Sequence, residues 1–536
     1  MAPEEIAESQ AMVTSKFSNV FRTFLEARTI PEDSSPDDAH VTVNDAVGAI
    51  AFYYEKIRGI AEYRDEHLVR QHAIRRVLGR RFILTQPTET MAMGLVKELV
   101  RSRYFRNQTI SLSKVHTIQA LLDQYLGVLD QLRMRHILTD KDQDWILFMV
   151  SCAIDEVLSP TTELEALVHV MYQEVEPMTN LQGINVDPRT RRVQLYLSVY
   201  RILLKPDVHR TEYFLLKTLA PHWAIPGSMS VEQLAAECYE LRKKIRDLIR
   251  HPLQKKFMGA YRRFRIPFVV LVTVLRSNGE ALFEEKDVLA KEVTRICEGF
   301  YNVYKRKLHI RAIRAFVYIF ITKMLLGLLI ELPYDLLTVG HIAPVPLLIN
   351  LLFPPVLLGF IAFSAKFPGK DNTASVIQAI NEIVYVDEPR MVFIPQAIGQ
   401  KKRKVALWVI FSFVYLALFI GSFALLGYIL KLLHFNVASG IIFFLFFCLI
   451  TFFGVTLRRS AKELTLLKPK QSLWLAFVDP FLLPIVQVGR WLSFNVSRVN
   501  VFVFIFDILI ELPLQALIEI TEEWWSFMRE KKDEIE

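Results

Sequence analysis

The chain has 536 residues, a formal net charge of +8 and a positive mean hydropathy of +0.27, although 22% of its residues are charged. The length excludes a single small domain, since domains usually span about 100 to 200 residues. Positive hydropathy beside so many charges excludes a uniformly polar chain. It indicates a polar part joined to a very apolar part, and charges become sparse after about residue 314.

The first 300 residues are predicted to be helical, because apolar residues recur there at spacings of three and four. The predicted helices are Ile6–Ala27, Val43–Leu78, Thr88–Tyr104, Val115–Leu132, Gln143–Leu158, Thr161–Val175, Arg191–Leu204, Val231–Leu248 and Lys286–Tyr304. Ser159 to Glu163, and Ser230 with Gln233, resemble helix caps. The acidic, proline-bearing stretch Thr29–His40 predicts a flexible linker. We therefore expect an N-terminal helix and linker over 1–42 and a helical domain over 43–304.

That helical domain is expected in the cytosol. The first residues, MAPEEIAESQAMV, are acidic and lack the basic and apolar regions of a secretory signal. The four cysteines are far apart, without CxxC or Cys/His ligand spacing, which argues against a disulfide framework or a structural zinc site.

Two stretches are long and apolar enough to cross a bilayer, which takes about 20 residues. Val405–Leu430 and Phe435–Leu457 carry no formal charge. Four further segments are weaker candidates, because charges or prolines interrupt them: Ala315–Leu337, Thr338–Ala365, Leu473–Val488 and Val499–Ile518. We expect four to six spans and leave open whether Thr338–Ala365 is a kinked span or a re-entrant hairpin. The fold class is all-α: a soluble helical N-terminal region followed by a polytopic transmembrane helix bundle.

Basic flanks predict the topology, because Lys and Arg collect in cytoplasmic loops. The flanks 305–314, 401–404 and 458–470 are all basic, and an even number of predicted spans separates each from the next. The expected protein is therefore a multipass protein of a bacterial-type cell (inner) membrane, with a cytoplasmic N-terminal domain and C-terminal tail. Residues 305–472 would hold four candidate spans, and 473–536 two membrane-associated segments and the charged tail.

The segment 375–385 has an amphipathic pattern. Its residues Val376, Ile377, Ile380, Ile383 and Val384 share one helical face. A helix on the membrane surface, a helix packed beneath the bundle and an ordinary connector helix all fit this pattern.

A repeated pentapeptide, LIELP, occurs at 329–333 and 509–513, each time after an aromatic-rich apolar run. Paired proline-interrupted segments with acids at corresponding positions are typical of transporter sites at the membrane midplane, although the acids would equally suit the headgroup level. Ionisable groups in a membrane are functional candidates because they are costly to bury. The candidate polar site consists of Lys323, Glu331, Asp335, Asp507 and Glu511.

The stretch 241–265 is strongly basic, with Phe257, Tyr261 and Phe264 interleaved. Such a patch can bind nucleic acid or anionic lipid headgroups, and a solvated face is an equally weighted alternative. We favour lipid over nucleic acid because the domain is tethered to a bilayer. The candidate lipid patch consists of Arg242, Lys243, Lys244, Arg246, Lys255, Lys256, Arg262, Arg263 and Arg265. A second basic stretch, Arg70–Arg81, is expected to be a charged face.

Neither a phosphate-binding loop nor a catalytic or metal motif is visible in the sequence. We therefore predict no catalytic residues, metal or cofactor. A function other than catalysis is favoured. The expected function is a membrane-surface or interaction scaffold, with the lipid bilayer, anionic headgroups and an unidentified protein as partners. A transporter or channel using the intramembrane acids is the second hypothesis, and a membrane-embedded enzyme acting on lipid is the third.

Overall fold

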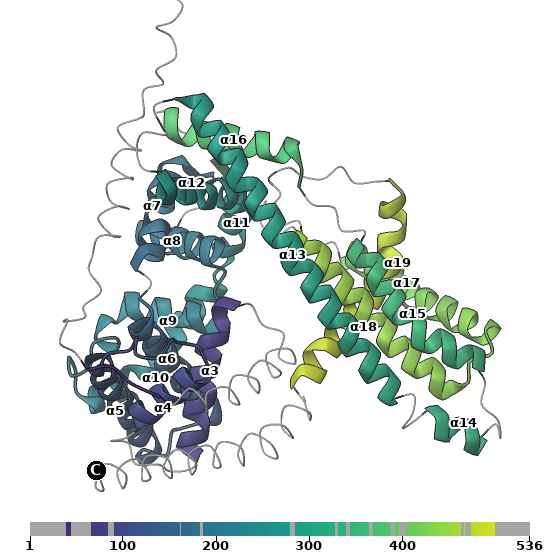
Figure 1. Cartoon of the computed structure of the whole chain (residues 1–536), viewed down its shortest axis with the longest axis horizontal. Helices are drawn as coiled ribbons and strands as arrows, with labels where there is room; N and C mark the ends of the chain where they lie inside the picture. Colours follow the sequence, from purple (N-terminus) through teal and green to yellow (C-terminus); the bar gives the residue numbers. More distant parts are fainter. Residues whose placement is uncertain are drawn as a thin grey trace, which may run out of the picture. The chain divides into compact units, whose positions relative to one another are not determined.

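The computed structural model (Figure 1) describes residues 39–43, 66–83, 91–160, 162–182, 186–278, 283, 285–326, 331–338, 344–363, 368–386, 392–395, 405–461, 466 and 473–498. These residues are almost entirely helical, so the predicted all-α fold is confirmed. The predicted helix Ile6–Ala27, the span Val499–Ile518 and the basic run 401–404 lie outside the described residues.

The chain forms two compact units, which we describe separately. The helical unit comprises Ser18–Arg262, Pro389–Ile394 and Phe502–Glu536, and the bundle unit comprises Met1–Phe17, Arg263–Glu388 and Pro395–Val501. This division falls earlier than the boundary expected near residue 304.

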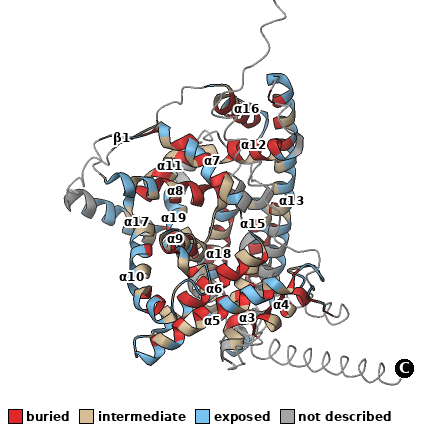
Figure 2. Cartoon of the chain, turned by 90° about the vertical axis from the view of Figure 1, so that its left-hand side faces the viewer, coloured by how far each residue is buried: buried red, intermediate tan, exposed pale blue. Residues whose placement is uncertain are grey.

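The helical unit is a stack of antiparallel and crossing helices (Figure 1). Its elements are α3 (Glu66–Ile83), α4 (Met91–Arg101), α5 (Leu112–Met134), α6 (Asp140–Leu158), α7 (Thr162–Met178), β1 (Thr179–Gln182), α8 (Pro188–Leu204), α9 (Val208–Leu219), η3 (Pro221–Trp223), α10 (Val231–Arg250), α11 (Pro252–Tyr261) and β2 (Val392–Pro395). The strands β1 and β2 pair with each other. Figure 2 shows buried residues concentrated in α5 and α6 and exposed residues along α10.

The core of the helical unit closes around Trp223, whose side chain is fully buried. The side chains of Gln124 and Tyr125 each donate a hydrogen bond of 3.1 Å to its carbonyl oxygen. Burial raises the pKa of Tyr125, so the hydroxyl stays protonated as a donor. The predicted cap at Ser230 is confirmed: Ser230 and Gln233 form a reciprocal capping box at the start of α10.

Arginines of the basic helix α3 form ion pairs with acidic residues of α6. This corrects the expectation that Arg70–Arg81 forms a charged face in contact with solvent. Arg70 and Arg210 both donate to the buried carboxylate of Asp155. Arg75 pairs with Asp144 and also lies over the ring of Phe148. These ion pairs hold α3 against α6.

His72 of α3 contacts α9. Its Nε2 lies 3.1 Å from Oδ2 of Asp207, the N-cap of α9. Burial by itself would raise the pKa of Asp207, but the hydrogen bonds from His72 and from the backbone amide of Arg210 outweigh it, and the pKa is lowered.

The bundle unit contains η4 (Arg262–Phe264, at the change of unit), α12 (Arg265–Asn278), α13 (Lys286–Leu326), α14 (Leu332–Thr338), α15 (Pro344–Phe363), α16 (Lys370–Tyr385), α17 (Val405–Leu432), α18 (Val437–Ala461) and α19 (Leu473–Arg498). Helix α13 runs unbroken through residue 304. Helix α15 is continuous through Pro354 and Pro355, so the described residues contain no hairpin there. Helix α12 is short, and Phe268, Val270 and Leu271 are buried.

Helix α16 packs against α12 and α13 (Figure 1), so its apolar face is covered by protein and not by lipid. Val376, Ile380 and Val384 are fully or almost fully buried there. At its N-terminal end, Asn372 donates 2.8 Å to the hydroxyl of Tyr301 and accepts 2.7 Å from the amide of Leu466. Packing against α12 and α13 fits a connector helix as well as a helix beneath the bundle.

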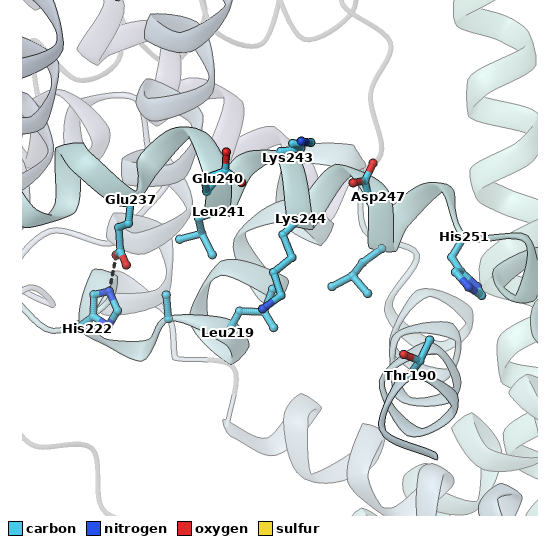
Figure 3. Close-up of a pocket in the computed structure, with 12 residues that line it drawn as sticks. Thr190, Leu219, His222, Glu237, Glu240, Leu241, Lys243, Lys244, Asp247 and His251 are labelled. Atoms are coloured by element: carbon cyan, nitrogen blue, oxygen red, sulfur yellow. Dashed lines mark hydrogen bonds and ion pairs between the residues drawn. The ribbon is translucent and has the colours of Figure 1, made fainter. Parts of the chain in front are cut away.

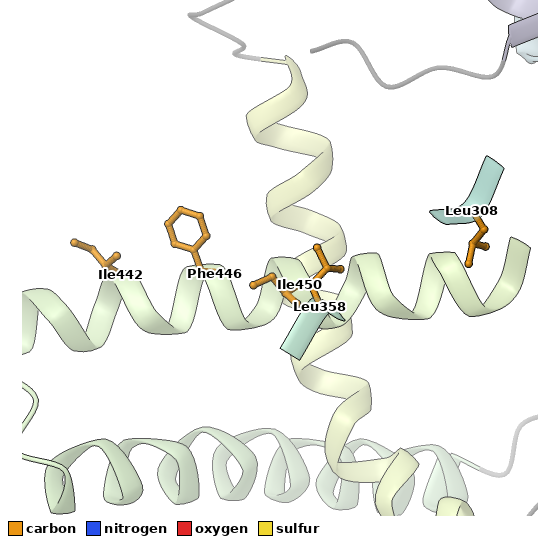
Figure 4. Close-up of a cluster of buried hydrophobic side chains, with 5 residues drawn as sticks. All are labelled: Leu308, Leu358, Ile442, Phe446 and Ile450. Carbon is orange, nitrogen blue, oxygen red and sulfur yellow. The ribbon is translucent and has the colours of Figure 1, made fainter. Parts of the chain in front are cut away.

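Helices α13, α15 and α18 share a core of buried hydrophobic side chains (Figure 4). Leu308 of α13 lies beside the C-terminal end of α18, where Arg458 and Arg459 follow in sequence. Two of the three basic flanks therefore meet at the same end of the bundle.

The contact between α18 and α19 depends on a glycine. A Cβ atom at Gly489 would overlap the carbonyl group of Cys448 and approach Cβ of Phe452 to 2.8 Å. Gly440 of α18 has open space around it.

We expect Gly489→Ala to destabilise the bundle by about 1 to 3 kcal/mol, because the backbones of α18 and α19 must separate to admit the methyl group. Gly440→Ala is the matched control and should be neutral or slightly stabilising, since alanine favours helix. Denaturant unfolding of the full chain in detergent measures both variants. Equal stability of the two would contradict the close approach.

Asp207→Asn should lower stability by about 1 to 2 kcal/mol at neutral pH, because it removes a charge-assisted hydrogen bond while keeping the cap. Since the folded-state pKa of Asp207 is lowered, this stability is present above the ordinary aspartate pKa of 3.8 and is lost as the pH falls below it. Unfolding from pH 7 to pH 3 measures the difference. Asp130→Asn, at a carboxylate that is 58% exposed, is the control. A difference between Asp207→Asn and the wild type that does not shrink as the pH falls from 7 to 3 would rule the explanation out.

Candidate functional site

Helix α17 exposes an apolar surface nearly all the way round. The stretch Val409–Leu432 has a mean hydropathy of 2.5. Only 6% of the residues in its most apolar 18-residue segment are buried. Phe411, Phe413 and Tyr428 are each more than two thirds exposed. Water does not tolerate a contiguous apolar surface of this size on a soluble monomer.

Helix α18 is the second helix that is long and apolar enough to cross a membrane, over Val437–Thr456. In its most apolar 18-residue segment, 44% of the residues are buried. Among the described residues these two are the helices that meet that test, and they support membrane association. Both were predicted as spans from the sequence. The described parts of the remaining predicted spans do not reach the same criterion.

One buried polar cluster lies inside the bundle. Glu331, just before α14, is 2% exposed, and Asn350 of α15 is 1% exposed. The Asn350 amide donates 2.5 Å to the Glu331 carboxylate and 3.3 Å to the carbonyl oxygen of Ser439 on α18. The sequence singled out Glu331, but Asn350 carries no charge and lacked any signal.

The other members of the predicted polar site are not brought together with Glu331 by any described contact. Lys323 lies within α13 and Asp335 within α14. Asp507, Glu511 and the second LIELP lie outside the described residues.

The predicted lipid patch separates into residues with different roles. Arg242 is engaged inside the helical unit: it pairs with Asp142, donates 2.9 Å to the carbonyl of Lys141 and lies over the ring of Trp145. Desolvation lowers its pKa. Arg242 therefore holds α10 against α6 and is not available to a headgroup.

The free cations of the patch lie on α10 and α11. Lys243, Lys244, Arg246 and Lys255 are exposed, and Lys256 is half-buried. None of these five forms an ion pair with a described residue. Arg262 and Arg263 are exposed and Arg265 is half-buried, but these three lie at the change of unit.

Two of the three aromatic residues interleaved with the basic ones are buried, and the third, Phe264, is half-buried with Arg263 over its ring. Phe257 and Tyr261 are fully buried, and the Tyr261 hydroxyl lies 2.6 Å from that of Thr179. Nucleic-acid binding by base stacking would require these rings at the surface. Burial of both rings favours a headgroup over a base.

The exposed face of α10 adds two residues that the sequence analysis missed. Tyr239, which is 70% exposed, and Arg250 share one side of the helix with Lys243 and Arg246. Steps of four, three and four residues keep all four within a sector of about 60°. We name Tyr239, Lys243, Arg246 and Arg250 the α10 stripe. Helical spacing applied to this segment alone was the signal that would have found it.

The chain matches no protein-family model, no curated protein and no solved structure with significant similarity. Its function therefore has to be argued from its own residues.

Proposed function

We propose that this chain is a multipass protein of a bacterial-type inner membrane whose helical unit is a cytoplasmic scaffold that binds an anionic membrane surface. The observation that carries the proposal is the α10 stripe. It presents three exposed cations that form no ion pair with a described residue, with an exposed tyrosine at one end. Each Lys or Arg near an anionic surface contributes about 1 kcal/mol, and tyrosine suits the interface.

The topology supports this assignment. Helices α17 and α18 carry basic residues where the pair begins and ends in sequence, at 401–404 and 458–459, and a short loop between them. Basic residues favour the cytoplasmic side, so both open ends of the pair would face the cytosol. Helices α15 and α19, of 20 and 26 residues, are the further proposed spans, within a total of four to six.

Removing the three stripe cations together (Lys243→Gln, Arg246→Gln, Arg250→Gln) should weaken binding to anionic vesicles by up to about 100-fold. The full chain is reconstituted in phosphatidylcholine nanodiscs, and its binding to phosphatidylglycerol-containing vesicles is measured by flotation. Wild-type binding should also weaken with salt, because exposed charges are screened.

The matched control removes three exposed cations elsewhere on the helical unit: Arg106→Gln, Arg135→Gln and Lys141→Gln. If both triple variants lose binding equally, the effect belongs to net charge and not to the stripe. Vesicle binding that ignores salt and anionic lipid would end the proposal.

A transporter or channel is the second candidate, favoured by the buried contact between Glu331 and Asn350. A carboxyl group shielded from water inside an apolar bundle is a functional candidate by default. Glu331→Gln keeps the shape and the acceptor for Asn350 but removes the carboxylate. We expect ion or proton flux in proteoliposomes to fall at least about tenfold in this variant if the group lies on the path. Flux unchanged from the wild type would eliminate Glu331 as its basis.

A further inference from the structure

A short extended segment, residues 39–43, is docked on the helical unit at an edge formed by residues 107–112. We name these two segments the strap and the docking edge. His40 of the strap pairs with Ser111 of the edge in an isolated antiparallel bridge. The edge leads directly into α5, whose N-cap is Ser111. The last two residues of the predicted linker, Ala39 and His40, therefore belong to a bound segment.

The side chains of the strap alternate as in a β-strand. Val41 and Val43 are 3% and 8% exposed, whereas His40 and Thr42 are exposed. Successive side chains of an extended chain point to opposite sides, so the two valines enter the helical unit and the residues between them face away. Three consecutive β-branched residues, Val-Thr-Val, favour this extended form.

The polar contacts of the strap are made by its backbone. The Val41 amide donates 2.9 Å to the carbonyl oxygen of Ile110, and the Leu112 amide donates 2.9 Å to that of Ala39. The Gln108 amide donates 3.3 Å to the carbonyl oxygen of Val41. Because these are main-chain bonds, they do not depend on the residue types of the strap.

Asn107 extends the pairing with its side chain. Its Nδ2 donates 2.8 Å to the carbonyl oxygen of Val43, and its Oδ1 accepts 3.0 Å from the amide of the same residue. The side-chain amide thereby takes the place of a strand residue. The docking edge recognises two features of its occupant: an extended main chain, and apolar side chains at alternate positions.

Few contacts hold the strap. A two-stranded pairing is marginally stable by itself. Ordering five residues costs conformational entropy. The burial of two valines and hydrogen bonds that replace bonds to water return a free energy of similar size. The strap can therefore leave the docking edge while the core of the helical unit stays folded.

The cavity of about 730 Å³ beside α10 is a different surface (Figure 3). Lys243 of the α10 stripe lines it together with the carboxylates Glu240 and Asp247. None of its lining residues belongs to the strap or to the docking edge. Occupation of the docking edge and headgroup binding by the α10 stripe therefore involve separate residues.

We propose that the docking edge binds an extended Val-x-Val segment of a partner protein by strand addition, and that the strap occupies the edge in cis as its competitor. The strap itself shows which partner fits. A segment with the same alternation can form the same main-chain bonds and fill the same two side-chain positions. This protein-binding site does not rest on the proposed binding to lipid.

The probe is a fluorescent peptide with the sequence of residues 38–45, DAHVTVND. It is titrated into the full chain in phosphatidylcholine nanodiscs and followed by anisotropy. Val41→Asp expels the strap and should bind the peptide at least about tenfold more tightly than the wild type, because a site occupied in cis is free for only a fraction of the time. Thr42→Asp adds the same charge at an exposed position and should bind as the wild type does.

The outcomes of this titration separate the two parts of the proposal. No peptide binding by Val41→Asp would overturn the docking edge as a binding site. Equal binding by the wild type and both variants would overturn the competition with the strap. Vesicle flotation of Val41→Asp reports separately on lipid binding and should match the wild type.

Two modified peptides test the main-chain bonds on the Val41→Asp protein. N-methylation of the peptide at the Val41 position removes the donor to Ile110 and should weaken binding at least about tenfold. N-methylation at the Thr42 position is the matched control, because the Thr42 amide has no hydrogen bond to a described residue. Equal loss of binding with both peptides would rule out strand addition.

Hydrogen exchange of the wild type tests the strap without any substitution. The Val41 amide should exchange faster than a core amide such as that of Val150 in α6, because the strap detaches without global unfolding. Exchange of both amides at the same slow rate would overturn the detachable strap.

Discussion

The apolar surface of α17 is the constraint from which the rest of the molecule follows. A helix satisfies its own backbone hydrogen bonds, so it can leave water. A bilayer requires this, because its hydrocarbon core offers no other hydrogen-bond partners. Because so few residues of its apolar segment are buried against the rest of the chain, α17 needs a surrounding that accepts aliphatic and aromatic side chains. Lipid is the surrounding that we propose, with the charged ends of the bundle of α13, α15, α18 and α19 at the interface.

Inside such a bundle, close packing takes the place of the hydrophobic effect. Gly489 lets α19 approach the backbone of α18, as small residues do between membrane helices. One buried amide there has two partners: Asn350 donates to Glu331 and to the carbonyl oxygen of Ser439, across three segments of the chain. A buried amide of this kind fixes which helices are neighbours, because the alternative is an unsatisfied group in hydrocarbon.

The helical unit uses its many arginines in two different ways. Those of α3, together with Arg210 and Arg242, neutralise Asp155, Asp144 and Asp142 and join helices within the unit. Those at Arg246 and Arg250 face outward with exposed side chains. A positive net charge therefore does not measure the charge available to a partner. The proposed headgroup surface depends on cations of α10 that form no ion pair with a described residue.

The sequence by itself determined the all-α class, the apolar stretches of α17 and α18, the capping box at Ser230 and most helix positions, because all of these depend on residues close together in the chain. Tertiary structure alone decided which charges are free. Whether Arg242 faces Asp142 or solvent depends on α6 meeting α10, a contact across 100 residues that helical periodicity does not encode. The same holds for the burial of Phe257 and Tyr261, the covering of α16 by α12 and α13, and the role of Asn350. In each case the partner comes from a distant segment, and local pattern carries no information about that partner.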